Sequence, residues 1–324
     1  MKYKLLGQTG LQVSELCFGT MSFGGDASQE ESAAMYKACR DRGINFFDCA
    51  DAYSKGKAET ILGKLMRSER DHLVVTSKCF NQMDDDMNTR GGNRRHILRA
   101  VEASLQRLNT DRLDVLFMHR WDNDVPLEET LRALEQLVAD GKVLYLGASN
   151  WSAWQVSKAL GIADKRGWPR IDVIQPMYNL VKRQSEVEIF PMALAENLGV
   201  ITYSPVGGGV LSGKYGLKNR PNMGRIVDKK EYTDRYGEDW VFEVAEKFTA
   251  YAKKAGHHPV SLAVAWAAQH PAVTCPIIGA RNMEQLEPSL NALDIGMDAK
   301  MHGEIAALSR TPPNATDRRE EQLG

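Results

Sequence analysis

Four polar side chains suited to proton chemistry end or closely follow short apolar runs of this chain. Asp48 ends the run INFFD, and Tyr53 follows five residues later. Lys78 closes LVVTSK, and His119 closes DVLFMH. This set suits general acid catalysis: the phenol can donate a proton, and the carboxylate, ammonium and imidazole can tune it. The set does not contain a nucleophile paired with a base, as nucleophilic catalysis requires. The electrophile or reductant must therefore come from a cofactor.

Each member of this set also has a purely structural interpretation. An ammonium near the protein interior is costly without a partner, so Asp48 and Lys78 can be a buried ion pair that serves only the fold. A single histidine such as His119 is often a core residue. In the functional interpretation Lys78 lies against Tyr53 and lowers the pKa of its phenol, which is about 10 when unperturbed.

Neutral hydrogen-bonding groups and one aromatic ring lie at the ends of three further runs. Ser149 and Asn150 follow VLYLGA, Gln175 lies in DVIQP, and Tyr203 lies in GVITYS. The polar side chains suit a carboxamide, and the ring of Tyr203 offers a face for a flat heterocycle. The alternatives are that Asn150 is a helix N-cap and that Tyr203 is a core residue.

Three cations accompany these groups. Lys214 and Arg225 lie in the long Gly-, Lys- and Arg-rich segment 205–238, and Arg281 precedes the last helical stretch. Cations near a helix N-terminus suit phosphate groups, so one basic pocket for phosphates is expected. The alternative is that Lys214 and Arg225 are solvated loop charges.

The elements that must position these residues alternate along the chain. An open dinucleotide-binding sheet needs GxGxxG after its first strand, and CFGTMSFGG does not fit that spacing. Eight strand–helix units predict a single (β/α)8 TIM barrel over residues 1–324, with long loops at the C-terminal mouth where the candidate residues converge. Ser28 with Glu31, Gly43 and Asn282 mark expected helix ends. Strands are expected at 13–19, 44–49, 72–78, 114–119, 143–148, 172–176, 199–204 and 274–279, and helices near 29–42, 57–69, 93–108, 127–140, 152–166, 185–197, 239–270 and after 282.

Composition excludes several classes of protein. The 324 residues hold 41 Lys and Arg against 42 Asp and Glu, a net charge of −1, which argues against a nucleic-acid binder or a polybasic membrane-surface protein. No apolar run of about 18 residues and no signal-peptide core occurs, so a cytoplasmic protein is expected. The 5 cysteines are scattered without CxxC spacing, which indicates reduced, buried thiols and no metal site.

Eight segments in order resemble the aldo-keto reductase family over the whole chain, most closely the branch of bacterial reductases and potassium-channel β subunits. The resemblance implies a (β/α)8 barrel that uses NADP(H) to reduce aldehydes or ketones to alcohols. The segments are LGQTGLQVSELCFGTMSFG, FFDCADAYSKGKAETILG, VTSK, SLQRLNTDRLDVLFMHRWD, GKVLYLGASNW, IQPMYNL, ITYSPVGGGVLSGKY and PIIGARNMEQLE.

The resemblance also implies roles for single residues. Tyr53 matches the general acid, Asp48 and Lys78 the pair that lowers its pKa, and His119 the residue that orients the substrate carbonyl. Arg281 is placed for the 2′-phosphate of NADP(H), at the adenosine end. The remaining cofactor contacts implied are Gly19, Thr20, Met21, Ser149, Asn150, Gln175, Tyr203, Ser204, Pro205, Val206, Gly208, Leu211, Lys214, Gly279 and Gln285.

Three departures from the family pattern bear on affinity and substrate. Pro288-Ser289 stand where a Glu-Asn pair contacts adenine, which puts the NADPH preference in question. Cys49 and Ser54 replace more usual residues beside Asp48 and Tyr53. Trp121 replaces a frequent Pro, and it either shapes the substrate pocket or packs a loop. The substrate and the oligomeric state are not readable, and a slowly turning NADP(H)-binding redox-sensing subunit is the alternative to an enzyme.

Overall fold

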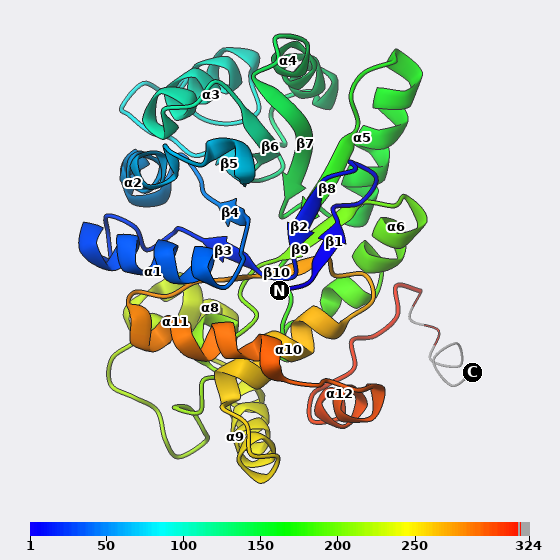
Figure 1. Ribbon diagram of the computed structural model, residues 1–324. Coiled ribbons are helices and arrows are strands. Elements are labelled where there is room, and N and C mark those ends of the chain that lie inside the picture. Colours follow the sequence, from blue (N-terminus) through cyan, green and yellow to red (C-terminus); the bar gives the residue numbers. More distant parts are fainter. Residues whose placement is uncertain (317, 319–324) are drawn as a thin grey trace.

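Eight parallel strands close into one barrel in the computed structural model, which describes residues 1–316 and 318. The hydrogen-bonded order is β10-β3-β4-β5-β6-β7-β8-β9, so each strand pairs with its sequence neighbours and β10 closes the ring (Figure 1). The predicted (β/α)8 barrel is confirmed. Its strands are β3 (Cys17–Gly19), β4 (Phe46–Asp48), β5 (Val74–Cys79), β6 (Leu113–Met118), β7 (Val143–Ser149), β8 (Ile171–Gln175), β9 (Gly199–Thr202) and β10 (Cys275–Ile278).

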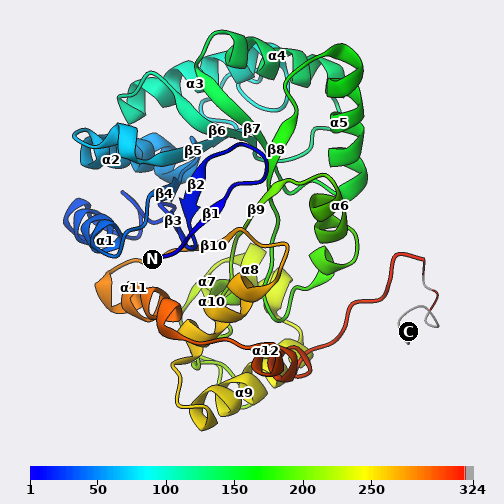
Figure 2. The same ribbon diagram turned by 45° about the vertical axis from the view of Figure 1, so that its right-hand side comes forward.

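Helices surround the barrel (Figure 2), and their apolar residues are buried toward the protein interior. In α4, Leu131, Leu134 and Leu137 recur every three residues and are almost fully buried, as the helical period requires. The helices are α1 (Gln29–Asp41), α2 (Lys57–Met66), α3 (Arg94–Leu108), α4 (Leu127–Ala139), α5 (Ala153–Arg166), α6 (Ile189–Ala195), α7 (Arg225–Asp228), α8 (Lys230–Tyr236), α9 (Asp239–Lys254), α10 (Pro259–Gln269), α11 (Met283–Leu290) and α12 (Ala299–Ala306).

The helix ends expected from sequence are confirmed. Ser28 and Glu31 form a capping box at the start of α1, and Gly43, with φ +85°, follows its end. The side chain of Asn282 accepts a hydrogen bond from the backbone of Gln285 at the start of α11.

The predicted strand 13–19 is wrong as a single element. Gln12–Ser14 (β2) pairs antiparallel with Tyr3–Leu5 (β1), and only Cys17–Gly19 belongs to the barrel. The chain turns between them because the Ser14 hydroxyl donates to the Leu16 carbonyl and the Ser14 backbone N–H donates to the Asn45 side chain. Leu6 and Val13 of this hairpin then pack in the barrel interior with core residues such as Phe46.

Two of the expected helices are also shorter or divided. The stretch 239–270 is two helices, because the chain turns at Gly256, with φ +74°, and α10 begins with Pro259. The stretch 185–197 contains only α6 after a short 3-10 turn. The segment 205–238, expected as a long loop, carries the short helices α7 and α8 near the barrel mouth.

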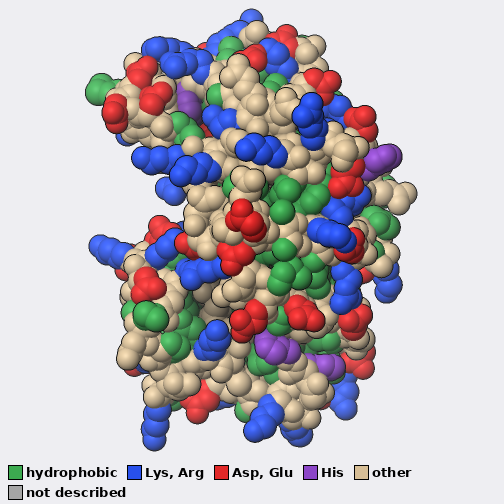
Figure 3. All heavy atoms as spheres, turned by 60° about the vertical axis from the view of Figure 1, so that its left-hand side comes forward, with side chains coloured by type: hydrophobic (Ala, Val, Ile, Leu, Met, Phe, Trp, Pro, Cys, Tyr) green, Lys and Arg blue, Asp and Glu red, His purple; other side chains and the backbone are tan. Residues whose placement is uncertain are grey.

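The described part of the chain shows neither a membrane-crossing helix nor a metal cluster. No helix there combines enough length with enough apolar character to cross a membrane. No group of three His, Cys, Asp or Glu side chains in these residues is arranged to hold a metal ion. Acidic and basic side chains alternate over the face in Figure 3, in keeping with the balanced net charge.

Gly7 allows the hairpin to approach the barrel, and its replacement is a test of that contact. Its φ is +56°, and a Cβ there would lie 2.4 Å from the backbone nitrogen of Gly199. Gly10 also has positive φ, +77°, but open space around it. We expect Gly7→Ala to lower the free energy of unfolding by about 1–3 kcal/mol more than Gly10→Ala, measured by urea denaturation. Equal losses in the two variants would contradict this close packing.

Candidate active site

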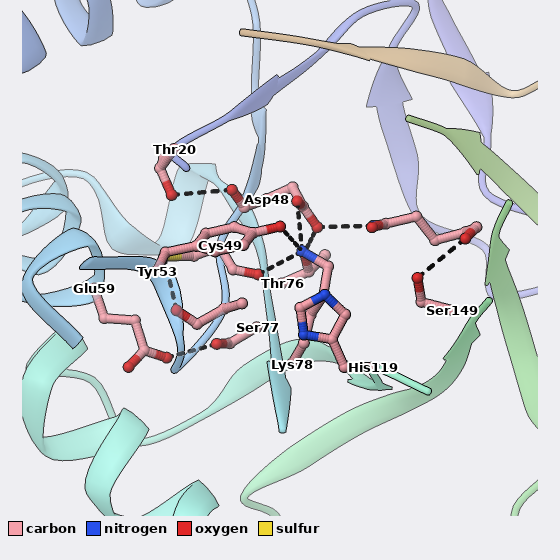
Figure 4. A network of polar contacts seen from close by, with 12 residues as sticks. Thr20, Asp48, Cys49, Tyr53, Glu59, Thr76, Ser77, Lys78, His119 and Ser149 are labelled. Carbon is pink, nitrogen blue, oxygen red and sulfur yellow. Dashed lines mark hydrogen bonds and ion pairs between the residues drawn. The ribbon is translucent and has the colours of Figure 1, made fainter. Parts of the chain in front are cut away.

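The candidate residues lie at the same end of the barrel because they end or follow neighbouring parallel strands. Asp48 is the last residue of β4, and Lys78 is the last but one of β5. His119 follows β6 directly, and Ser149 and Gln175 end β7 and β8. Figure 4 shows the side chains of Asp48, Lys78 and His119 turned toward one another.

The Lys78 ammonium is the centre of this group. It has no exposed surface, and its nitrogen lies 2.6 Å from Asp48 Oδ2, 2.7 Å from the Cys49 carbonyl and 3.1 Å from Tyr53 Oη. An ammonium has three donors, so all three are used. Burial opposes the charge, but the Asp48 carboxylate and the Tyr53 oxygen outweigh it and raise the pKa of Lys78. Lys78 is therefore a fixed cation against the phenol of Tyr53.

The second oxygen of Asp48 is also satisfied. It accepts a hydrogen bond of 2.8 Å from the Thr76 hydroxyl and one of 2.9 Å from the Gln175 amide. Together with Lys78, this gives the buried Asp48 carboxylate three side-chain donors. Thr76 was not singled out from the sequence, although its register opposite Asp48 on β5 gives it this place.

Burial outweighs the expected lowering of the Tyr53 pKa by Lys78. Burial of the hydroxyl raises the pKa of Tyr53 to about 12, although the nearby Lys78 charge acts in the opposite direction. The desolvation of the phenolate outweighs the attraction of one ammonium. Tyr53 is therefore a neutral phenol at physiological pH, with a proton to give and a cation 4.8 Å from its ring centre.

His119 lies beside Tyr53 as a neutral imidazole. The two rings meet edge to face, with their centres 6.2 Å apart. Burial, with the charges of Lys78 and Arg120, lowers the pKa of His119 to about 3. The Asn81 amide nitrogen lies 3.3 Å from Nδ1 and donates to it, which leaves the ring proton on Nε2. Sequence reasoning missed Asn81 because it lies in an irregular loop after β5.

A second hydrogen-bonded group stands next to this set. The Tyr203 hydroxyl donates to Asn150 Oδ1 over 2.7 Å, and the Asn150 amide nitrogen donates to the Ser149 hydroxyl and to the His119 carbonyl. The Ser149 hydroxyl donates to the Gln175 carbonyl. The helix α5 is capped by Ser152, so the interpretation of Asn150 as a plain N-cap is wrong. Asn150 instead takes a left-handed conformation, φ +58°, as residues at functional sites often do.

The cations expected at a phosphate site are only partly brought together. Arg281 Nε lies 3.2 Å from Asp26 Oδ2, and Arg225 Nη2 lies 3.9 Å from the same oxygen. Lys214 is exposed and forms no ion pair with any described residue. Asp26, which sequence reasoning missed, lies in the loop between β3 and α1.

Comparison with known proteins identifies the family of this chain. The model of the Aldo/keto reductase family matches residues 15–310. The chain belongs to the aldo/keto reductase family. A probable voltage-gated potassium channel subunit beta of Oryza sativa subsp. japonica is 36% identical over 98% of this chain and 99% of its own length.

Two relatives named for redox chemistry are similarly close. An uncharacterized oxidoreductase, YrpG, of Bacillus subtilis is 35% identical over 93% of this chain and 94% of its own length. A versiconal hemiacetal acetate reductase of Aspergillus parasiticus is 31% identical over 91% of this chain and 93% of its own length. Family membership and these relatives support a general oxidoreductase role and, in general terms, a nicotinamide cofactor.

Thr20, directly after the first barrel strand β3, contacts the candidate active site. The Thr20 hydroxyl and backbone N–H both donate to the Asp48 carbonyl. A Cβ on Gly19 would lie 2.7 Å from the Ile277 side chain, so the close strand packing there needs glycine. Met21 is partly exposed, with 37% of its surface accessible.

The expected pyrophosphate loop after β9 combines buried and accessible residues. Ser204 has φ +58° and Gly208 φ +65°, and a Cβ on Gly208 would lie 2.7 Å from the Tyr232 ring. Gly208 and Val206 are partly exposed. Pro205 and Leu211 are buried, and the Leu211 backbone N–H donates to the Val206 carbonyl.

The adenosine end expected after β10 is built around Gln285, whose side-chain oxygen accepts from the Arg281 backbone. Gly279 has the backbone of Gly19 as its near neighbour. At the departure from the family pattern, Ser289 is buried and the Pro288 carbonyl accepts from the Ser261 hydroxyl. These two residues therefore pack into the protein, and their side chains offer no substitute for a Glu-Asn contact.

Trp121 packs in an aromatic cluster. Its ring lies 4.9 Å from that of Trp151 and 5.5 Å from that of Trp154, measured between centres. Trp151 also lines a cleft, together with Asn150, Tyr203 and the segment 309–313. The C-terminal segment 311–324 lies partly outside the described residues, at 317 and 319–324.

The residues present fit a nicotinamide dinucleotide. Ser149, Asn150 and Gln175 form an amide-and-hydroxyl group beside the proton-exchange set, and the Tyr203 ring borders it. Two arginines gather around a single carboxylate beyond the pyrophosphate loop. The donor set thus offers neutral groups of the kind that bind a carboxamide and cations of the kind that bind phosphates.

Asp51 is a buried acid near this site that the set described above does not use. Neither of its carboxylate oxygens has a side-chain hydrogen-bond partner among the described residues. Burial, with the neighbouring Glu59 charge, raises the pKa of Asp51 to about 7. Glu59 is itself held by the Ser77 hydroxyl and by Arg107. Between about pH 4 and pH 7, Asp51 is therefore mostly protonated in the folded chain but ionised in the unfolded chain.

This difference predicts a pH-dependent gain from Asp51→Asn. The raised pKa stabilises the wild type below about pH 4, and that contribution is lost as the pH rises toward 7. The advantage of Asp51→Asn in free energy of unfolding should therefore grow by about 1.4 kcal/mol per pH unit over this range and then level off. Urea denaturation at several pH values measures it. An advantage that does not change with pH would contradict the assignment.

Proposed function

We propose that this chain reduces aldehydes or ketones to alcohols with NADPH as the hydride donor and Tyr53 as the general acid. The observation that carries the proposal is the fully buried Lys78 ammonium, held between Asp48 and the Tyr53 hydroxyl. This arrangement gives a neutral phenol next to a permanent cation. It suits a step in which a proton leaves the phenol and the resulting charge is stabilised at once.

The residues of this chain divide the work in the proposed reaction. When bound, the nicotinamide supplies the hydride. The His119 Nε2–H donates to the substrate carbonyl oxygen and orients it. Tyr53 Oη gives its proton to that oxygen as it becomes an alkoxide. The phenolate then accepts from the Lys78 ammonium, whose position Asp48 fixes.

NADP(H), as opposed to NAD(H), is supported by charge near the pyrophosphate loop. The Arg281 guanidinium lies at the start of α11, where backbone N–H groups also favour an anion. We assign it to the 2′-phosphate. The substrate class is a small carbonyl compound, with no role for nucleic acid or membrane, in a cytoplasmic setting. Steady-state NADPH consumption against a panel of aldehydes, methylglyoxal, sugars and ketosteroids identifies the substrate.

The rice relative's name favours a second candidate function. That relative is named a potassium channel subunit beta. If this chain acts as such a subunit, it would bind NADP(H) and turn over slowly as a redox sensor. Comparison of single-turnover and steady-state rates separates the two proposals. An enzyme shows steady-state turnover with an added carbonyl substrate, whereas a sensor shows one fast turnover followed by slow cofactor release.

Replacement of Tyr53 by phenylalanine tests the proton donor. The change removes one oxygen, and a general acid typically accelerates a reaction about 100- to 10,000-fold, so steady-state carbonyl reduction should fall at least about 100-fold. NADPH affinity, followed by tryptophan fluorescence, should stay within a few-fold of the wild type.

Tyr145→Phe is the matched control, because its hydroxyl donates to the Thr9 carbonyl in the N-terminal hairpin segment. That variant should keep its turnover. A Tyr53→Phe chain with most of its rate would contradict the proposal.

A further inference from the structure

One carboxylate lies between the two arginines of the expected phosphate site. Asp26 Oδ2 is 3.2 Å from Arg281 Nε and 3.9 Å from Arg225 Nη2. The three residues come from separate segments: the loop between β3 and α1, helix α7, and the connection from β10 to α11. Their side chains are 38%, 26% and 38% exposed for Asp26, Arg225 and Arg281 respectively. All three are thus partly open to solvent and to a ligand.

The loop that carries Asp26 is firmly held. The Gly24 backbone N–H donates to the Ala27 carbonyl, and the Ala27 backbone N–H donates to the Ser22 carbonyl. The Ser22 hydroxyl donates to the Ala280 carbonyl, next to Arg281, over 2.6 Å. Phe23 and Ala27 are buried in the core. The Asp26 backbone therefore cannot swing away from the arginines without breaking these contacts.

We infer that Asp26 limits the affinity for the 2′-phosphate of NADPH. Asp26 would thereby set how strongly this protein prefers NADPH over NADH and how fast the protein releases NADPH. The inference rests on the proposed function, in which Arg281 receives that phosphate. Asp26 already neutralises part of the positive charge that would attract the phosphate. A phosphate bound by Arg281 lies within a few ångströms of the carboxylate and is repelled by it.

The repulsion is selective for the phosphorylated cofactor. NADH lacks the 2′-phosphate, so the charge nearest to Asp26 is absent from it. Its pyrophosphate is shared with NADPH and therefore cancels from the comparison. A carboxylate that only clasped the loops together would act in the opposite direction, because its loss would loosen the site and weaken both cofactors. The sign of the effect on NADPH separates these two roles.

The test is the dissociation constant of each cofactor for the full chain and for Asp26→Asn, measured by quenching of tryptophan fluorescence. Asparagine keeps the size of the side chain and removes its charge. We expect NADPH to bind on the order of tenfold tighter and NADH to change less than about twofold. The gain for NADPH should shrink between 20 mM and 500 mM salt, because ions screen partly exposed charges.

Three further variants frame this result. Asp26→Ser, which also lacks the charge, should tighten NADPH binding in the same direction. Asp85→Asn removes an exposed acid for which no ion pair with a described residue occurs, and it should change neither constant. Arg281→Ala should weaken NADPH at least about tenfold and NADH little, since a charge-assisted hydrogen bond is lost.

The outcomes separate the inference from the proposed function. A wild-type chain that binds neither cofactor overturns the proposed function and this inference with it. If the wild type binds NADPH and Arg281→Ala weakens it, but the Asp26 variants leave NADPH unchanged or weaker, only the inference is overturned. Equal tightening of NADPH and NADH binding also overturns the inference, because the inference states that Asp26 acts selectively on the 2′-phosphate.

Discussion

A lysine ammonium without exposed surface is the constraint on which the site depends. Removing such a charge from water costs several kcal/mol, and only full hydrogen bonding to an opposite charge offsets it. Asp48, the Cys49 carbonyl and Tyr53 provide those contacts to Lys78. Asp48 in turn needs Thr76 and Gln175. The ends of β4, β5 and β8 are therefore held in one arrangement by a single buried charge.

The same charge explains how opposing effects on Tyr53 are balanced. Burial keeps the phenol protonated, and the adjacent Lys78 favours the phenolate once the proton has left. The neutral His119 beside it completes a group with one mobile proton, one donor and one fixed cation. Before α11, Asp26 offsets part of the positive charge of Arg225 and Arg281.

Sequence reasoning reached the residues that follow strand ends, because parallel strands in a barrel must bring Asp48, Lys78 and His119 to one mouth. It did not reach contacts that only tertiary packing creates. Asn81 and Asp26 lie in loops without a periodic pattern, so nothing in their neighbours indicates a partner. The strand expected at 13–19 was divided by hydrogen bonds of Ser14 that reach as far as Asn45. The direction of the Tyr53 pKa shift depended on burial, which residue types do not reveal.

The most direct test of this account is the single-turnover rate of carbonyl reduction in Lys78→Met with saturating NADPH. Methionine is close to lysine in size but has no charge, so the variant loses the group that stabilises the phenolate. Thermal denaturation establishes that it is folded under the conditions used. The account predicts a rate at least about 100-fold below the wild type, with NADPH affinity within a few-fold. A folded Lys78→Met chain that reduces its substrate at a near wild-type rate would contradict the central role of the buried ammonium.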